Sequence, residues 1–432
     1  MSEWKKSSLG ELANAKGCVI QTGPFGSQLH KGEYQQEGVG VINPTHIKNR
    51  SVSHDSVPHV SGEVAERLAK HKVRSGDLLF ARRGEIGRHA LVKDSEHGWL
   101  CGTGCFLVRL NQEVADPSLV SYFLSTDDSL EWLNRHASGV VMPNLRNQVL
   151  QKAPVQVPCL AEQKEISRIL STVERAIEAQ ERIIQTTTEL KQALMQKLFS
   201  EGLRGEPQKE TEIGLVAESW EVVELGVHCR VQSGFAFRSQ DYTNGNNTIP
   251  ITKIGDIQNG GVFYTERSSY VPEGFWDDRR LDQFKLNTGD VLIALTGATT
   301  GKIGVFQHSF RAFLNQRAGR FLTDEEGLKR CFLPNLVRQP YFQSEISSNI
   351  LVAAQGNISP KQIEEIKIGL PAIHAQQEIA SILDMLERKV ACSRAKRRGL
   401  RDLFCTLLHA LMTGEINVNN LSFSDQVIAI NP

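Results

Sequence analysis

Two arginines stand where an apolar run meets a glycine. Arg82 and Arg83 follow the strand-like run Leu78–Ala81 and directly precede Gly84, so a loop at this point presents their guanidinium groups. A guanidinium group is shaped for bidentate contact with guanine in the major groove of DNA, and Asn or Gln amides serve adenine. Gly-rich loops with similar donors recur in the second half of the chain. The candidate nucleic-acid contacts are Ser27, Lys31, Arg82, Arg83, Arg88, Phe237, Lys253, Thr296, Thr299, Lys302, Gln316 and Arg317.

Taken singly, each of these residues also fits an ordinary solvated loop, so the hypothesis depends on the loops occurring as a matched set. The lysines suit phosphate oxygens better than base edges. The aromatic residues beside the Gly turns are expected to plug their own domain cores, with ligand contact as the alternative. These residues are Phe25, Phe235 and Phe237.

Motifs for catalysis are missing from the sequence. The run Gly297–Ile303 has three residues between its glycines and Ile after the Lys, whereas a phosphate-binding loop needs four residues and Ser or Thr. The run Asn43–Thr45 lacks the second Pro and the aromatic residue of the amino-methyltransferase motif. Only Cys101 and Cys105 lie close together, and no second pair completes a zinc set. We therefore predict no catalytic and no metal-ligating residues, with an enzyme built from scattered residues as an alternative.

Composition bounds the class of protein. A chain of 432 residues is too long for one typical core, so two or more domains are expected. The N-terminus has no signal-peptide pattern and no run of eighteen apolar residues occurs, which predicts a cytoplasmic protein without membrane spans. The formal net charge is zero, so any contact with DNA must be local or shared with a partner.

Two long stretches, Glu162–Phe199 and Gln377–Met412, must position these loops. In the first, apolar residues recur mainly at steps of three, four and seven, which is the spacing of one helix face. They are Ile166, Ile169, Leu170, Val173, Ile177, Ile184, Leu190, Leu194 and Leu198. A matching stripe follows 213 positions later. We expect two long antiparallel helices that pack on each other as a coiled-coil-like spacer.

The same offset of 213 relates other segments. Ser75–Ala81 matches Thr288–Ala294, and Pro158 before the first long helix matches Pro371 before the second. The segment Glu201–Glu218 is polar and predicts a linker. The fold class is therefore α+β, with two pseudo-symmetric mixed α/β domains separated by the two long helices. The expected bounds are 1–157 for the first domain, 158–203 for the first helix, 204–370 for the linker and second domain, 371–416 for the second helix and 417–432 for a loose tail.

This order resembles the specificity subunit of Type I restriction-modification systems. The resemblance is carried by Gly76–Leu79 with its repeat Gly289–Leu292, and by Pro158 followed by Glu162-Gln163, for which we align Gln376-Gln377 in the second half. In addition, Thr187–Leu190 is similar to the short Thr-Ala-Glu-Leu unit whose copy number sets helix length in this family.

The resemblance implies two target recognition domains, each reading one half of a split double-stranded DNA site. It implies that the helices set the gap and dock two modification (methyltransferase) subunits, with restriction (translocase and endonuclease) subunits completing the complex. The chain itself would bind no cofactor, and S-adenosylmethionine, ATP and Mg would belong to the partners. The candidate partner-binding residues on the second helix are Arg394, Lys396, Arg397 and Arg398. A non-catalytic protein-interaction scaffold is the alternative that the neutral charge leaves open.

Overall fold

The structure is a computed structural model that describes residues 4–48, 50–137, 144–243, 245–352, 356–416 and 418. The chain divides into two compact units, the first made of residues 1–181 and 395–432 and the second of residues 182–394. Two long unbroken helices, α6 (Leu160–Glu201) and α10 (Ile373–Met412), each contribute one part to either unit. Their bounds lie two to four residues inside the expected ranges 158–203 and 371–416.

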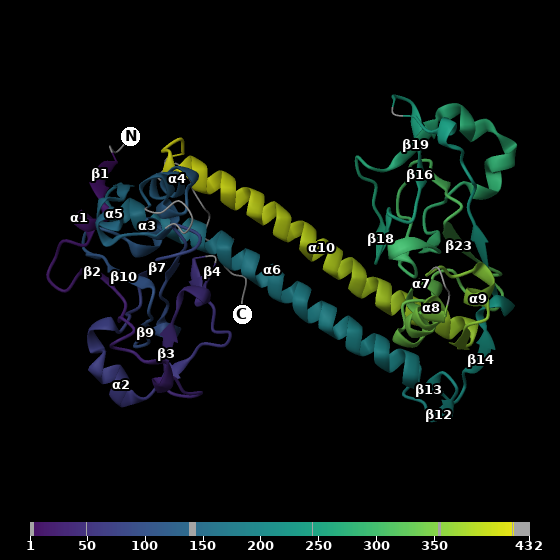
Figure 1. Cartoon of the computed structure of the whole chain (residues 1–432), viewed down its shortest axis with the longest axis horizontal. Helices are drawn as coiled ribbons and strands as arrows, with labels where there is room; N and C mark the ends of the chain where they lie inside the picture. The colour runs from purple at the N-terminus through teal and green to yellow at the C-terminus, as the bar shows by residue number, and fades with distance from the viewer. Residues whose placement is uncertain are drawn as a thin grey trace. The chain divides into compact units, whose positions relative to one another are not determined.

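The first unit is built on an antiparallel sheet with the strand order β2-β10-β7-β8, beside a smaller sheet with the order β6-β3-β9 (Figure 1). In the smaller sheet, β3 runs parallel to β9 and antiparallel to β6. The strands of the two sheets are β2 Val19–Thr22, β3 Val39–Ile42, β6 His59–Val60, β7 Leu78–Ala81, β8 His89–Leu91, β9 Leu100–Cys101 and β10 Cys105–Arg109. The other elements are β1 Lys5–Ser8, α1 Leu9–Leu12, β4 Ile47–Lys48, β5 Ser51–Val52, α2 Gly62–Arg67, α3 Pro117–Leu124, α4 Asp127–His136, α5 Asn147–Lys152 and β11 Pro154–Val157.

The second unit repeats this plan with the strand orders β15-β23-β20-β21 and β19-β16-β22. Its strands are β15 Cys229–Ser233, β16 Thr248–Thr252, β19 Ser269–Pro272, β20 Val291–Ala294, β21 Ile303–Val305, β22 Phe313–Leu314 and β23 Ala318–Thr323. The other elements are β12 Gln208–Thr211, β13 Gly214–Ala217, β14 Glu221–Glu224, β17 Ile257–Gln258, β18 Gly261–Val262, α7 Leu333–Leu336, α8 Pro340–Val352, α9 Pro360–Glu364 and β24 Lys367–Leu370. The predicted α+β class with two matching mixed domains is confirmed.

The central strand of each unit follows a turn that only glycine adopts easily. Gly76 and Gly289 have φ angles of 87° and 90°, in the left-handed region where a side chain is strained. Each turn leads into a strand, β7 or β20, whose four residues are all buried. Four consecutive buried apolar residues fit a strand that is covered on both faces, and they explain why these two segments match in the sequence.

Within each unit the facing parts of α6 and α10 run antiparallel. In the first unit Glu181 pairs with Arg397, and in the second unit Lys191 pairs with Glu387. Most of the predicted stripe faces inward, but Leu190 is 55% exposed. It lies six residues after Ile184, which places it about 240° around a helix that turns about 100° per residue. The spacing from Leu190 to Leu194 and Leu198 was regular, but Leu190 does not share their face.

A buried glutamine ties each domain to the long helix that follows it. The side-chain oxygen of Gln163 accepts from the backbone N–H of Asp116 at 2.7 Å, and its nitrogen donates to the carbonyls of Val114 at 3.0 Å and Pro158 at 2.9 Å. We call this arrangement the glutamine clamp.

The second unit contains the same clamp. Gln376 accepts from Lys329 N–H at 2.8 Å and donates to the carbonyls of Gly327 at 2.7 Å and Pro371 at 2.9 Å. Each partner lies 213 positions after its counterpart in the first unit. This corrects the alignment of Glu162-Gln163 with Gln376-Gln377, because Gln163 corresponds to Gln376.

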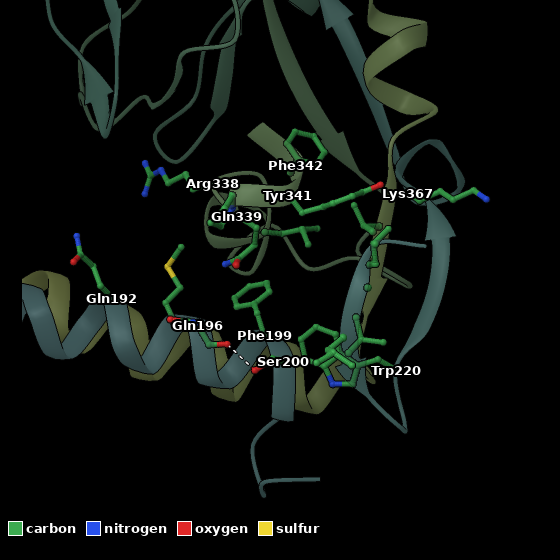
Figure 2. A pocket seen from close by; sticks show the side chains of 18 residues that line it. Gln192, Gln196, Phe199, Ser200, Trp220, Arg338, Gln339, Tyr341, Phe342 and Lys367 are labelled. Atoms are coloured by element: carbon green, nitrogen blue, oxygen red, sulfur yellow. Dashed lines mark hydrogen bonds between the residues drawn. The ribbon is translucent and has the colours of Figure 1, made fainter. Parts of the chain in front are cut away.

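The end of α6 packs under the second domain through aromatic rings. Phe199 stacks on Phe332 with ring centroids 5.2 Å apart and meets Trp220 edge-on at 5.8 Å. Figure 2 shows Phe199 and Trp220 together on one side of the groove between α6 and the domain. Because Trp220 is almost fully buried, this cluster anchors the chain where it enters the second domain.

One sequence-based expectation about a connecting segment needs correction, and another falls almost entirely outside the described residues. The predicted linker, Glu201–Glu218, contains an antiparallel hairpin of β12 and β13, with Val216 and Ala217 buried in the core of the second unit. The polar residues that suggested a linker make up β12, whereas the residues that pack lie next to each other at the end of β13. Of the predicted loose tail, 417–432, only Val418 lies within the described residues, and it is buried in the core of the first unit.

We predict that replacing either clamp glutamine by alanine destabilises its own unit. Gln163→Ala leaves one buried carbonyl, one part-buried carbonyl and one part-buried N–H without their partner, and Gln376→Ala does the same in the second unit. The expected cost is about 2–4 kcal/mol, because unsatisfied buried polar groups keep their full desolvation penalty.

Thermal unfolding checks this prediction. The matched controls are the exposed neighbours one position along each helix, Lys164→Ala and Gln377→Ala, which should change the unfolding temperature little. Equal effects of a clamp variant and its neighbour would contradict the role of the clamp.

Candidate nucleic-acid interface

A buried aspartate lies at the base of the central strand in each unit. In the first unit Asp77 accepts from Arg109 Nε at 2.8 Å and Nη2 at 2.6 Å, and from the backbone N–H of Arg74 at 2.7 Å. The pair links the start of β7 to the end of β10. Since both of these side chains are largely buried, they belong to the frame that holds the loops and not to the exposed surface.

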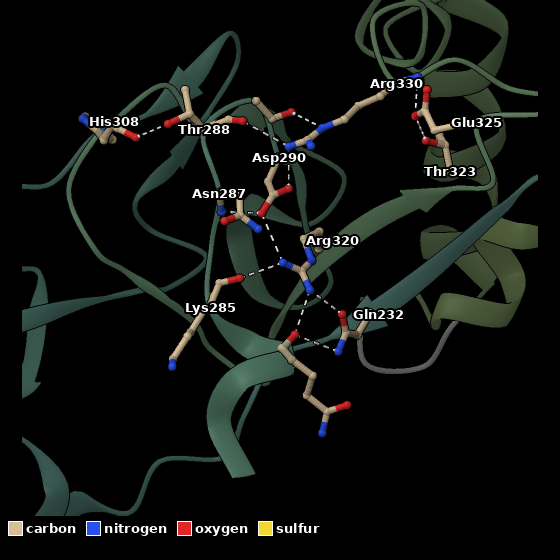
Figure 3. A network of polar contacts seen from close by, with 12 residues as sticks. Gln232, Lys285, Asn287, Thr288, Asp290, His308, Arg320, Thr323, Glu325 and Arg330 are labelled. Carbon is tan, nitrogen blue, oxygen red and sulfur yellow. Dashed lines mark hydrogen bonds and ion pairs between the residues drawn. The ribbon is translucent and has the colours of Figure 1, made fainter. Parts of the chain in front are cut away.

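In the second unit Asp290 occupies the same place with different partners. It accepts from Arg320 at 3.2 Å, from Arg330 at 2.7 Å and from the backbone N–H of Asn287 at 2.8 Å. Figure 3 shows Arg320 and Arg330 approaching Asp290 from different sides. The repeat therefore preserves the buried carboxylate, while the guanidinium groups that neutralise it come from new positions.

Three loops converge at the ends of the strands in the first unit. A Cβ atom on Gly23 would lie 2.1 Å from the carbonyl oxygen of Gly102, so these two loops touch through backbone. The backbone N–H of Arg82 donates to the carbonyl of Gly104 at 2.9 Å, which brings the loop after β7 to the same place. Only glycine permits the approach of Gly23, which explains the Gly-rich pattern in the sequence.

The corresponding loops of the second unit meet in the same way. A Cβ atom on Gly234 would lie 2.3 Å from the carbonyl oxygen of Leu314. The N–H of Gln316 donates to Phe235 at 2.9 Å, and the N–H of Leu295 donates to Arg317 at 3.0 Å. Leu295 and Arg317 lie 213 positions after Arg82 and Gly104, so both units build one loop cluster on one backbone plan.

The structure places the candidates of the first unit in three groups. Ser27, Lys31 and Arg83 are exposed. Arg82 is half-buried, and its Nε donates to Asn144 Oδ1 at 3.2 Å. Arg88 is also half-buried and lines a cleft of about 530 Å³ at the far end of its loop, where its Nε has no hydrogen-bond partner among the described residues.

In the second unit the exposed candidates are Gln316 and Arg317, which lie in the loop cluster itself. Lys253 is half-buried, with its ammonium group 4.2 Å from the centre of the Tyr242 ring. In the loop between β20 and β21, the hydroxyl group of Thr299 donates to the carbonyl of Ile254 at 3.1 Å.

The remaining candidates of the second unit are less accessible. Lys302 donates to the Gln258 side chain at 3.2 Å. The hydroxyl oxygen of Thr296 is buried without a hydrogen-bond partner among the described residues. Thr299 therefore contacts the residue next to Lys253, and Lys302 contacts the hairpin of Gln258.

The aromatic residues beside the Gly turns differ, because Phe237 plugs its core as expected and Phe25 does not. Phe237 is 7% exposed and packs in the core beside β16, so its ring presents no surface to DNA and the structure argues against its role as a contact. Phe25 is 58% exposed, although it was expected to plug a core. The two loops differ because Phe237 lies over an aromatic cluster with Phe235, Phe275 and Phe313.

Some functional candidates were missed. Lys48, in the β4–β5 hairpin, lines the same cleft as Arg88, and Tyr242 supplies the ring beneath Lys253. Neither residue lies in a Gly-rich loop, so the loop motifs do not indicate them. The hairpin does recur in the sequence as Ile257–Val262, and that repeat was the available signal.

The basic residues on α10 were candidate partner contacts. Arg394, Lys396 and Arg398 are exposed, and their role as partner contacts stays a prediction. Arg397 is half-buried because it pairs with Glu181 of α6, so it also contributes to holding the helices together.

Comparison with known proteins places this geometry in a family. The family described as the Type I restriction modification DNA specificity domain matches residues 1–188 and 217–400, which is most of both units. The chain belongs to this family. The Type I restriction enzyme MjaVIII specificity subunit of Methanocaldococcus jannaschii is 29% identical over 324 residues, or 73% of this chain and 75% of the relative. The putative Type I restriction enzyme MjaX specificity subunit of the same organism is 25% identical over 387 residues, or 86% of each.

A solved structure shares the fold of this specificity-domain chain. The crystal structure of the S subunit of a Type I restriction-modification system from M. genitalium matches with a TM-score of 0.62 at 18% identity, covering 95% of this chain and 96% of that one. Among the described residues, no helix is long and apolar enough to cross a membrane, and no cluster of three or more His, Cys, Asp or Glu residues is placed to hold a metal ion.

His89 fixes the end of the Arg82–Arg88 loop. Its ring nitrogens lie 2.8 Å from the carbonyl oxygen of Gly87 and 3.0 Å from both oxygens of Ser121. Burial lowers the pKa of His89 from 6.5 to about 4, and the charge of Arg50 adds to the shift. The folded state therefore holds a neutral imidazole at pH values where the unfolded chain binds a proton.

We predict that His89 makes the chain less stable as the pH falls from about 6.5 to 4. In this range the unfolded state binds more protons, so the free energy of unfolding falls with pH, by up to about 3 kcal/mol from this group. Urea unfolding at stepped pH should show a shallower pH dependence for His89→Gln than for the wild type. The exposed His97→Gln serves as the control and should keep the wild-type slope. An unchanged slope in His89→Gln would contradict the prediction.

Proposed function

We propose that this chain is the DNA-recognition subunit of a Type I restriction-modification complex, and that each unit reads one half of a split DNA site. The observation that carries the proposal is the duplicated loop cluster, in which one backbone plan presents different donors. Where the first unit has Gly102, Thr103 and Gly104, the second has Asn315, Gln316 and Arg317. In the loop after the central strand it is the first unit that carries the stronger donors, Arg82 and Arg83, where the second unit has Leu295 and Thr296.

Different donors on equivalent loops support two different half-sites. Base edges in the major groove are distinguished by the pattern of donors and acceptors that they face, so a loop carrying Gln316 and Arg317 selects other bases than one carrying Thr103. Lys31, Lys253 and Lys302 suit the phosphates that set the register of each unit on the duplex. The family to which the chain belongs favours this function over a general protein-interaction scaffold.

The finer features of the complex are also proposals. We infer that the chain is non-catalytic and works in the cytoplasm with two modification subunits, which dock on α6 and α10 and supply S-adenosylmethionine and adenine chemistry. Restriction subunits would add ATP- and Mg-dependent translocation and cleavage. The sequence offers no phosphate-binding or methyltransferase motif that would assign these reactions to the chain itself.

We predict that Arg83→Ala relaxes specificity at one base position. Arg83 is exposed at the end of the central strand, and loss of a bidentate contact to guanine should cost about 1–3 kcal/mol for that base alone. Methylation rates on a set of single-base site variants, measured with the modification subunit present, would reveal the affected position. Lys5→Ala, an exposed substitution on β1, is the control. Equal weakening on all sites would assign Arg83 to phosphate.

We also predict that the length of α6 sets the gap between the half-sites. Deleting Thr187–Leu190 removes about 6 Å at about 1.5 Å per residue and turns the rest of the helix by about 40°. The preferred gap should change while both half-sites stay the same, as measured by methylation of sites with varied spacing. The substitutions Thr187→Ala and Thr188→Ala keep the length and should keep the gap. An unchanged gap in the deletion variant would contradict the prediction that the length of α6 sets the gap.

A further inference from the structure

In the first unit, an arginine in the turn of the β4–β5 hairpin contacts α6. Arg50 Nη1 pairs with Glu174 at 2.9 Å, its Nε donates to Ser121 Oγ at 3.0 Å, and its guanidinium group lies 3.6 Å from the centre of the Tyr122 ring. Tyr122 also donates to Glu174 at 2.9 Å. The ring of Phe404, from α10, lies 5.9 Å from the Tyr122 ring. These side chains, which we call the Arg50 staple, fill the space between the hairpin, α3 and the helix pair.

The partners of the two glutamine clamps are 213 positions apart, and this offset shows which residues of the second unit correspond to the Arg50 staple. Adding 213 carries Glu174 to Glu387 and Tyr122 to Asn335, and subtracting 213 carries Phe404, on the second long helix, to Lys191 on the first. The hairpin Ile257–Val262 repeats the β4–β5 hairpin, and its turn has Gly260 where the first unit has Arg50. Of the Arg50 staple, only the glutamate is preserved.

A cleft of about 830 Å³ lies at this place in the second unit. Its lining includes the preserved Glu387 and the three replacements Lys191, Gly260 and Asn335. The side chains that occupy the space in the first unit are here smaller or, in the case of Lys191, turned to pair with Glu387. The cleft therefore exists because the Arg50 staple is absent from an otherwise repeated frame.

Most charges in the cleft are already paired. Arg330 is bound to Asp290 at 2.7 Å, and Asp384 is bound to Arg388 at 2.8 Å. Arg338 differs from these residues. Burial lowers the pKa of its guanidinium group, and the charge of Glu387 offsets part of that shift. Within the part of the chain that the structure describes, this guanidinium group makes no hydrogen bond.

Arg338 is oriented away from the aromatic groove at the end of α6. Figure 2 shows its guanidinium group pointing away from Phe199 and Trp220, and Arg338 also lines the 830 Å³ cleft. A half-buried guanidinium group gains most from an anion that can accept two parallel hydrogen bonds, and a carboxylate has that geometry.

We propose that this cleft receives an acidic side chain, Asp or Glu, from a protein partner, and that Arg338 binds its carboxylate. The proposal depends on the proposed function, which makes a modification subunit the partner. The cleft suits a single carboxylate better than DNA. Glu325, Asp384 and Glu387 also line it, and their repulsion grows with each phosphate of a chain, whereas one carboxylate brings a single charge. In the first unit the Arg50 staple occupies the equivalent place, so the two units bind their partners by different contacts.

Two variants test the cleft from opposite sides. Arg338→Gln removes the charge at similar size, and Asn335→Tyr refills the space with the residue found at the equivalent position of the first unit. The controls are Arg338→Lys, which keeps the charge, and Arg267→Gln, an exposed arginine of the same unit outside the cleft. Thermal unfolding of each variant establishes that it folds.

The measurement is titration of the full-length chain with its modification subunit, without DNA, followed by native mass spectrometry. The wild type should bind two modification subunits. Arg338→Gln and Asn335→Tyr should weaken one of the two binding steps by about tenfold or more and leave the other unchanged, since truncating a buried charge contact acts locally. Arg338→Lys should bind more tightly than Arg338→Gln, and Arg267→Gln should match the wild type.

The outcomes separate the two proposals. If the wild type binds two modification subunits and the cleft variants bind them equally well, the cleft is not a partner site. If the variants lose affinity for DNA but keep both partners, the cleft binds phosphate and the proposal is wrong. A wild-type chain that binds no modification subunit would overturn the proposed function and the assignment of the cleft with it.

Discussion

One buried side-chain amide in each half couples recognition to the helical frame. Gln163 and Gln376 each bind a backbone N–H and two backbone carbonyls, so a single side chain joins the domain, the proline turn and the first turns of the long helix. Both glutamines are almost completely buried, and water cannot replace the lost bonds cheaply. Within each unit, the position of the loop cluster relative to its helix depends on this contact.

The two units share this backbone frame but differ in the side chains that it carries. The buried carboxylates Asp77 and Asp290 hold equivalent strands, yet their guanidinium partners come from different positions. The loop that is Gly102–Gly104 in one unit is Asn315–Arg317 in the other. The Arg50 staple of the first unit is replaced by an open cleft in the second. Backbone contacts set the fold, so the side chains between them can change the DNA sequence that is read and the way that a partner is held.

Much of this fold could be predicted from the sequence, because the repeat multiplies weak local signals. The Gly-Asp turn and its buried strand, the proline before each helix and the offset of 213 all proved correct. The errors arose where local pattern and tertiary packing disagree. Leu190 continued a regular spacing but lies on another face, and Glu201–Glu218 looked polar but contains a packed hairpin. The site was less predictable: Arg83, Gln316 and Arg317 are exposed, whereas Phe237 is buried, and nothing in the local sequence separates these outcomes.

The measurement that tests the central claim most directly is adenine methylation mapping in a host that carries this chain with its neighbouring modification subunit. The account predicts a bipartite motif, in which two short and different blocks are separated by a constant unread gap, and predicts that deleting the chain abolishes methylation at that motif. A single uninterrupted motif, or methylation that persists after the chain is deleted, would contradict it.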